Sequence, residues 1–130
     1  MAKITEEMKT MIANQATFIA TTNADSTPNL VTKGTAQVLD DEHIVFFELS
    51  GGRTWENLQK NPAVAIGVAD KSTIQGYRFV GKAEFITEGD LYESAKKVAE
   101  MLHIPTPPKA AVKVKVDAIY NLGAGGQKID

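Results

Sequence analysis

Apolar and polar side chains alternate with a period of two over much of the chain, and this pattern predicts a protein built mainly of β-strands. Near the C-terminus, Val112, Val114 and Val116 alternate with two lysines and an aspartate. Such alternation is typical of a strand with one buried and one wet face. Six strands are expected, at residues 16–22, 29–39, 43–49, 63–69, about 74–86 and about 112–117.

Apolar positions with a helical period predict three helices between these strands. One covers the N-terminal segment, where Thr5 can cap its start; a short one begins at Arg53 and ends before Pro62; a third covers about residues 90–102. The expected buried stripe of the third helix consists of Leu91, Ala95, Val98 and Leu102. Because short turns join most of the strands, antiparallel pairing is favoured. The sequence therefore predicts a mainly β fold, a small antiparallel barrel with helices packed outside it.

Length and composition narrow the classes of protein that need to be considered. The chain has 130 residues, which suits a single domain over residues 1–130, with a glycine-rich and flexible tail at 124–130. The formal net charge of −2 predicts no nucleic-acid or anionic-membrane partner, since either would need a basic face. Cysteine is absent, and no apolar stretch approaches the ~20 residues of a membrane span. A cytoplasmic location is the expectation.

The segment from Phe47 to Pro62, FELSGGRTWENLQKNP, carries the strongest functional signal. An apolar strand ends at Ser50-Gly51-Gly52, and a helix follows at once with Arg53 and Thr54. The unpaired N–H groups and the dipole at a helix start attract anions, and an arginine fork suits phosphate oxygens. The segment is therefore interpreted as a phosphate-binding corner. From spacing alone, an ordinary strand-turn-helix connection explains the segment about equally well.

Other candidate chemistry is weaker. His43 and His103 have no second metal ligand at a recognised spacing, so no metal site is predicted. Trp55, the single tryptophan, is expected to pack the short helix against its sheet rather than to bind a ligand. Lys33 lies between Thr32 and Gly34, whose small side chains leave room for a flat group beside the strand.

Three segments in order resemble the pyridoxamine 5′-phosphate oxidase-like family of FMN-binding split barrels. They are PNLVTKGTAQVLDD (28–41), SGGRTWENLQKNPAVAI (50–66) and GYRFVGKAEFITEG (76–89). The resemblance extends over about residues 16–122, because ATFIATTNADSTPNL and VKVKVDAIYNL look like the first and last strands of that family. It implies a six-stranded antiparallel split β-barrel with flanking helices, a homodimer, and one FMN at each of two sites on the subunit interface.

The resemblance also implies which residues hold the cofactor. By this resemblance, the backbone of the second strand would lie along the flavin ring. The corner before the short helix would bind the phosphate, and the two residues before the corner would line it. A later strand would reach the flavin, often from the second subunit. The implied cofactor-binding residues are Val31, Thr32, Lys33, Gly34, Ser50, Gly51, Gly52, Arg53, Thr54, Gln75, Gly76 and Tyr77. Lys33 or the adjoining amides would favour the anionic reduced flavin. No general acid or base is predicted.

Two departures from the vitamin B6 oxidase pattern narrow the expected activity. Arg53-Thr54 stands where that oxidase has Arg-Lys, and the chain ends in GAGGQKID in place of a substrate segment with arginine and histidine. A small FMN-dependent oxidoreductase other than pyridoxamine phosphate oxidase is therefore expected. The alternatives are a non-catalytic electron-transfer or flavin-storage protein, and a relative that binds haem or a deazaflavin.

Overall fold

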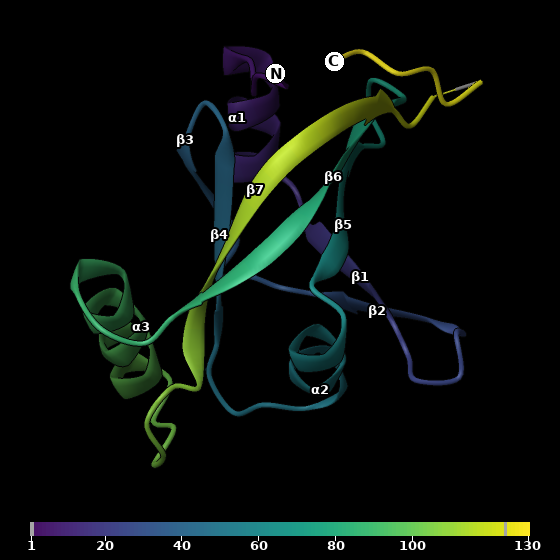
Figure 1. The fold of residues 1–130 in the computed structure, drawn as a ribbon. Coiled ribbons are helices and arrows are strands. Elements are labelled where there is room, and N and C mark those ends of the chain that lie inside the picture. Colours follow the sequence, from purple (N-terminus) through teal and green to yellow (C-terminus); the bar gives the residue numbers. More distant parts are fainter. Residues whose placement is uncertain (1, 124) are drawn as a thin grey trace.

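The computed structural model describes residues 2–123 and 125–130, and it consists of one antiparallel sheet with three helices outside it (Figure 1). The helices are α1 (Glu6–Asn14), α2 (Arg53–Lys60) and α3 (Asp90–Met101). The strands are β1 (Thr17–Thr22), β2 (Pro28–Thr32), β3 (Gln37–Asp40), β4 (His43–Glu48), β5 (Ala63–Asp70), β6 (Gln75–Ile86) and β7 (Ala110–Asn121). The prediction of a mainly β antiparallel fold is confirmed.

The strand count differs from the prediction because the expected strand 29–39 is two strands. β2 and β3 lie at opposite ends of the strand order β2-β1-β5-β6-β7-β4-β3. The link between Thr32 and Gln37 can reach at most about 18 Å, whereas seven strands laid flat span about 29 Å. The sheet must therefore curl until its edges meet, which gives a barrel.

The bend at residues 33–36 joins those two edges. The Lys33 N–H donates to the Thr17 carbonyl of β1 at 3.0 Å, and the Phe47 N–H of β4 donates to the Thr35 hydroxyl at 3.0 Å. The bend therefore hydrogen-bonds to both sides of the seam. The predicted single strand at residues 29–39 could not bond to both sides, because one strand would lie at only one edge of the sheet.

Two apolar clusters hold the helices to the barrel. The larger one fills the interior and includes Ile19, Phe46 and Phe79, with α1 covering it through Met8, Met11 and Ile12. Thr5 caps α1 as predicted, since its hydroxyl accepts the Met8 N–H at 3.3 Å. The smaller one packs α3 against β4 and β7 through Val45, Phe47, Ala95 and Ala111.

The end of α3 departs from the predicted stripe. Leu102 is 59% exposed, because the helix ends at Met101 and His103 takes a left-handed conformation with φ of 58°. The chain then turns away, so the last predicted contact is not made.

The C-terminal residues run beside β7. Lys128 forms a β-bridge with Tyr120, the Ile129 N–H donates to the Ile119 carbonyl at 2.7 Å, and the Lys3 N–H donates to Asp130 Oδ2 at 2.7 Å. Both chain ends therefore lie at the same end of the barrel (Figure 1). The flexibility expected for the tail stays a prediction.

Candidate functional site

The corner between β4 and α2 has the geometry that the sequence predicted. Gly51 and Gly52 turn the chain with φ of 83° and 131°, a region that residues with a Cβ avoid. Gly52 is the N-cap of α2 and supplies no side-chain hydrogen bond to the first turn. A Cβ placed on Gly52 would meet no atom within 4 Å. The start of α2 is therefore without a side-chain cap and has open space beside Gly52, as an anion site requires.

Arg53 and Thr54 differ in how they face this corner. The Arg53 side chain is 62% exposed, and its nearest acid is Glu56, at 3.9 Å. It is therefore mobile enough to turn towards a ligand. Thr54 is buried, and its hydroxyl accepts a hydrogen bond from Asn29 Nδ2 at 3.2 Å. As an acceptor there, the hydroxyl keeps its own proton to donate.

A buried network of amides and hydroxyls fixes α2 beneath the corner, and sequence reasoning missed it. Asn57 Nδ2 donates to Thr21 Oγ1 at 3.0 Å and to Asn23 Oδ1 at 2.8 Å, and Asn57 is 5% exposed. Thr21 belongs to β1 and Asn23 to the turn after it. These bonds hold the helix against the first hairpin, and so they set where the N-terminus of α2 points.

Replacing Asn57 with alanine is expected to lower the free energy of unfolding by about 2–3 kcal/mol, since the buried Thr21 hydroxyl and the half-buried Asn23 amide oxygen would both lose this donor. Chemical denaturation measures the loss. Asn14→Ala is the matched control, because the Asn14 amide bonds only to the Thr10 carbonyl on an exposed helix face. That control should change stability by less than about 0.5 kcal/mol. Equal losses in the two variants would mean that the network contributes nothing special.

A hollow of about 250 Å³ brings together two of the predicted cofactor segments. Thr32, Lys33 and Gly34 line it from the bend, and Ser50 and Gly51 line it from the corner. A Cβ on Gly34 would meet nothing within 4 Å, so there is open space in front of the bend. Val31, by contrast, packs its side chain against the barrel core and offers only its backbone.

Glu48 also lines this hollow and was not predicted. Its side chain is 1% exposed, and its Oε1 lies 2.5 Å from Lys33 Nζ, whose side chain is 21% exposed. The cation expected beside the ring is therefore paired with a buried carboxylate.

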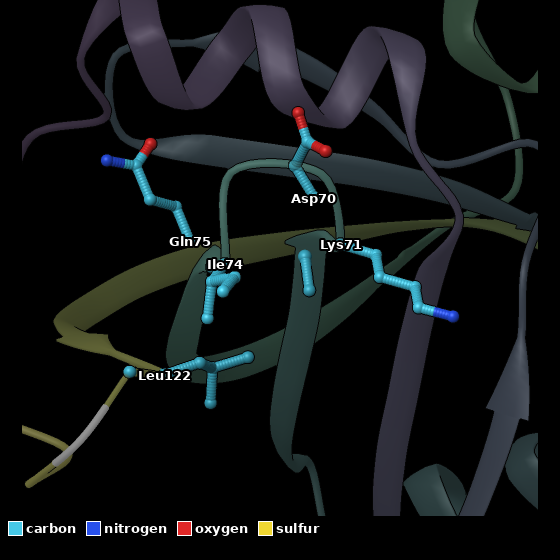
Figure 2. A pocket seen from close by; sticks show the side chains of 8 residues that line it. Asp70, Lys71, Ile74, Gln75 and Leu122 are labelled. Carbon is cyan, nitrogen blue, oxygen red and sulfur yellow. The ribbon is translucent and has the colours of Figure 1, made fainter.

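Gln75 and Gly76 lie in another part of the chain, away from the corner. They line a separate pocket at the β5–β6 hairpin, together with Ala69, Ile74 and Leu122. Figure 2 shows the side chains of Gln75 and Asp70 directed towards α1, with Ile74 close to Leu122. Tyr77 is half-buried, and burial, with a smaller contribution from the Glu7 charge, raises the pKa of its hydroxyl. Within one chain, this third segment does not join the other two.

The outer surface of the sheet between these two regions is mainly apolar, with Arg78 as a charged residue on the same face, opposite Gly67. Ala20 pairs directly with Leu30 and with Ala65, and Ala65 pairs with Val80, so the four residues share one face. Phe18, Leu30 and Leu122 are exposed by 43%, 65% and 44%. We call this surface, formed by Phe18, Ala20, Leu30, Ala65, Gly67, Val80 and Leu122, the outer apolar face.

Trp55 packs on Phe85 with ring centroids 4.7 Å apart, which confirms a packing role for the tryptophan.

The histidine at the start of β4 contacts a nearby acid: His43 Nδ1 lies 2.8 Å from Asp40 Oδ1. In residues 2–123 and 125–130 there is no group of three histidine or acidic side chains that could hold a metal. No helix in the same residues is long and apolar enough to cross a membrane.

The curled antiparallel sheet with three helices outside it is a split barrel. The sequence model of the family described as pyridoxamine 5′-phosphate oxidase matches residues 4–123, and the chain belongs to this family. An uncharacterized protein of Methanocaldococcus jannaschii is 34% identical over 127 residues, covering 96% of this chain and 85% of its own.

Solved structures have the same fold. HupZ of Group A Streptococcus is 38% identical, with a TM-score of 0.84 over 98% of this chain and 99% of the other. An FMN-binding protein of Syntrophomonas wolfei is 15% identical, with a TM-score of 0.73 over 88% of this chain and 83% of the other. At that identity the second match supports the split-barrel fold alone.

Proposed function

We propose that the protein is an FMN-binding flavoprotein that acts as an oxidoreductase on a small molecule. One observation carries the proposal: the uncapped start of α2, with Arg53 beside it, opens next to the hollow that Thr32, Lys33 and Gly34 share with Ser50 and Gly51. A phosphate group and a flat polar ring joined to it would find suitable partners at adjacent places. Members of this family are expected to hold FMN in this way.

The residues present fit FMN. The N–H groups at the start of α2 and the Arg53 guanidinium would bind the phosphate, with the Thr54 hydroxyl as a further donor. The backbone at Val31–Gly34 would lie along the ring. The hollow of about 250 Å³ is smaller than a typical ligand pocket of about 300–1,000 Å³. One chain therefore offers part of a site, which a second chain would complete.

We assign the outer apolar face to a second copy of this chain. The face is continuous with β2, whose last residue, Thr32, lines the hollow. Its small central residues, Ala65 and Gly67, allow another sheet to approach closely. A two-fold arrangement would bring the partner's Gln75–Tyr77 segment towards the ring, which accounts for its distance from the corner within one chain.

Replacing Leu30 with glutamate is expected to convert the dimer to a monomer near 14.0 kDa. A two-fold axis would bury the new charge twice against apolar residues, and buried charges are costly. Mass in solution measures the change. Met101→Glu is the control, because Met101 is 76% exposed on α3 and should leave the dimer intact. An unmodified protein that is monomeric and still binds FMN would refute the interface site.

In a catalytic cycle the bound flavin supplies the electron transfer, and the protein supplies position, electrostatics and access. Arg53 and the α2 amides would anchor the phosphate, and the bend at residues 33–36 would fix the ring against the barrel seam. Pyridoxamine phosphate oxidation is not proposed, because Arg53-Thr54 replaces the Arg-Lys pair.

The visible spectrum of the purified protein tests the cofactor class. Flavin bands near ~370 and ~450 nm are expected. A Soret band would instead show that the bound cofactor is haem and not FMN. Turnover with a reduced nicotinamide and an electron acceptor then separates an oxidoreductase from an electron carrier or a flavin store, since only the enzyme would cycle.

A further inference from the structure

The barrel interior contains an acid where its neighbours are apolar. Ile44, Phe46 and Glu48 alternate along β4 and point to the same side, into the core. Glu48 is 1% exposed, as deeply buried as the two apolar residues before it. A buried carboxylate is costly unless a cation or several donors compensate it. Its presence therefore needs an explanation in terms of its surroundings.

Lys33 supplies the compensating charge. Its ammonium lies 2.5 Å from Glu48 Oε1, although no group in the described chain meets hydrogen-bond geometry at that oxygen. The charge interaction does not depend on that geometry, so we treat the contact as an ion pair. The Lys33 ammonium also lies 6.0 Å from the centre of the Phe46 ring, at the edge of the core.

The two members of the ion pair differ in how far they are exposed to the hollow. Lys33 is 21% exposed and can reach the hollow, whereas Glu48 lies behind it in the core. Both line the hollow where Gly34 and Ser50 meet. A ligand at the bend would therefore meet the ammonium first, with the negative charge of the carboxylate directly behind it.

We propose that Glu48 is a positioning residue that holds the Lys33 ammonium in place and cancels its charge, so that the face presented to the flavin is electrically neutral. The inference rests on the proposed FMN site. Reduced flavin is anionic near N1 at neutral pH, whereas oxidised flavin is neutral. A lone lysine would favour the reduced form, and the neutral pair removes most of that preference.

Removing one charge of the pair or both then has a distinct expected effect. Without Glu48, the Lys33 ammonium faces the flavin with no carboxylate behind it, and the reduced form gains. Without both residues, neither charge is left beside the flavin. The face is then neutral again, and the preference changes little. If the pair only closed the barrel, its loss would change the affinities for oxidised and reduced FMN equally.

The test measures dissociation constants for oxidised and reduced FMN in Glu48→Gln, in the double variant Lys33→Met/Glu48→Gln and in the unmodified protein. We expect Glu48→Gln to favour reduced over oxidised FMN by about tenfold or more, and a tenfold change equals about 30 mV for two electrons. The double variant should change the ratio by less than about threefold, equal to roughly 14 mV. The control Glu84→Gln removes an exposed carboxylate on β6 and should leave the ratio as it is.

The outcomes separate this inference from the proposed function. If the unmodified protein binds neither form of FMN, the proposed function and the inference both fail. If it binds FMN and Glu48→Gln leaves the ratio unchanged, only the inference fails. If Glu48→Gln does not fold, the double variant decides, because a loss of reduced FMN by about tenfold or more would show that Lys33 acts as an uncompensated cation.

Discussion

Arg53→Ala is expected to weaken FMN binding by about 10- to 100-fold, because a guanidinium that donates to phosphate forms strong, charge-assisted hydrogen bonds. Riboflavin lacks the phosphate, so its affinity should fall by less than about threefold. In the structure Arg53 is 62% exposed, and its 3.9 Å contact with Glu56 is too long to hold it. Calorimetric titration with both ligands measures the difference.

The chain offers a second arginine as a control for this prediction. Arg78 lies on β6 with its guanidinium 4.3 Å from the centre of the Tyr120 ring, away from α2. Arg78→Ala should affect FMN and riboflavin to the same extent, whatever its effect on assembly. If Arg53→Ala also weakened both ligands equally, Arg53 would hold structure and the phosphate assignment of the corner would be wrong.

Gly81→Ala is expected to lower the free energy of unfolding by about 3 kcal/mol or more, through overpacking against backbone. A Cβ at Gly81 would stand 1.9 Å from the Lys115 carbonyl oxygen of β7. The pairing of β6 with β7 shifts register between Val80 and Gly81, so the two backbones approach at a bulge. Relief would require β6 and β7 to move apart at the centre of the sheet.

Denaturant unfolding measures this loss, and Gly34→Ala is the control. A Cβ at Gly34 meets nothing within 4 Å, so stability should change by less than about 1 kcal/mol. If both variants were equally stable, the tight approach at Gly81 would not be a constraint, and the bulge would not explain the glycine.

Local sequence signals predicted most of the fold. The Thr5 cap, the glycine corner and the stop at Asn61-Pro62 each act on a few neighbouring residues, and the structure confirms all three in α1 and α2. The break between β2 and β3 could not be predicted in this way. It arises because the edges of a curled sheet meet at residues 33–36, and this depends on contacts with Thr17 and Phe47, which are distant in sequence.

In the candidate site, too, the features that depend on neighbouring residues were predictable, and those that depend on residues distant in sequence were not. The corner was predictable because glycines, a helix start and an arginine follow one another in the chain. Asn29 and Asn57 were missed, since their partners come from other elements. Glu48 had a usable signal: in the run His43–Glu48, the alternation that buries Ile44 and Phe46 also places Glu48 inside. Its pairing with Lys33 depends on the seam and needed the structure.

An equilibrium titration of the cofactor-free protein with FMN, monitored by flavin fluorescence, tests the proposed site most directly. Saturable binding at about one FMN per chain is expected, with riboflavin much weaker, because the phosphate corner supplies a large part of the affinity. Absence of saturable binding, or equal affinity for FMN and riboflavin, would contradict a phosphate-anchored flavin at this corner.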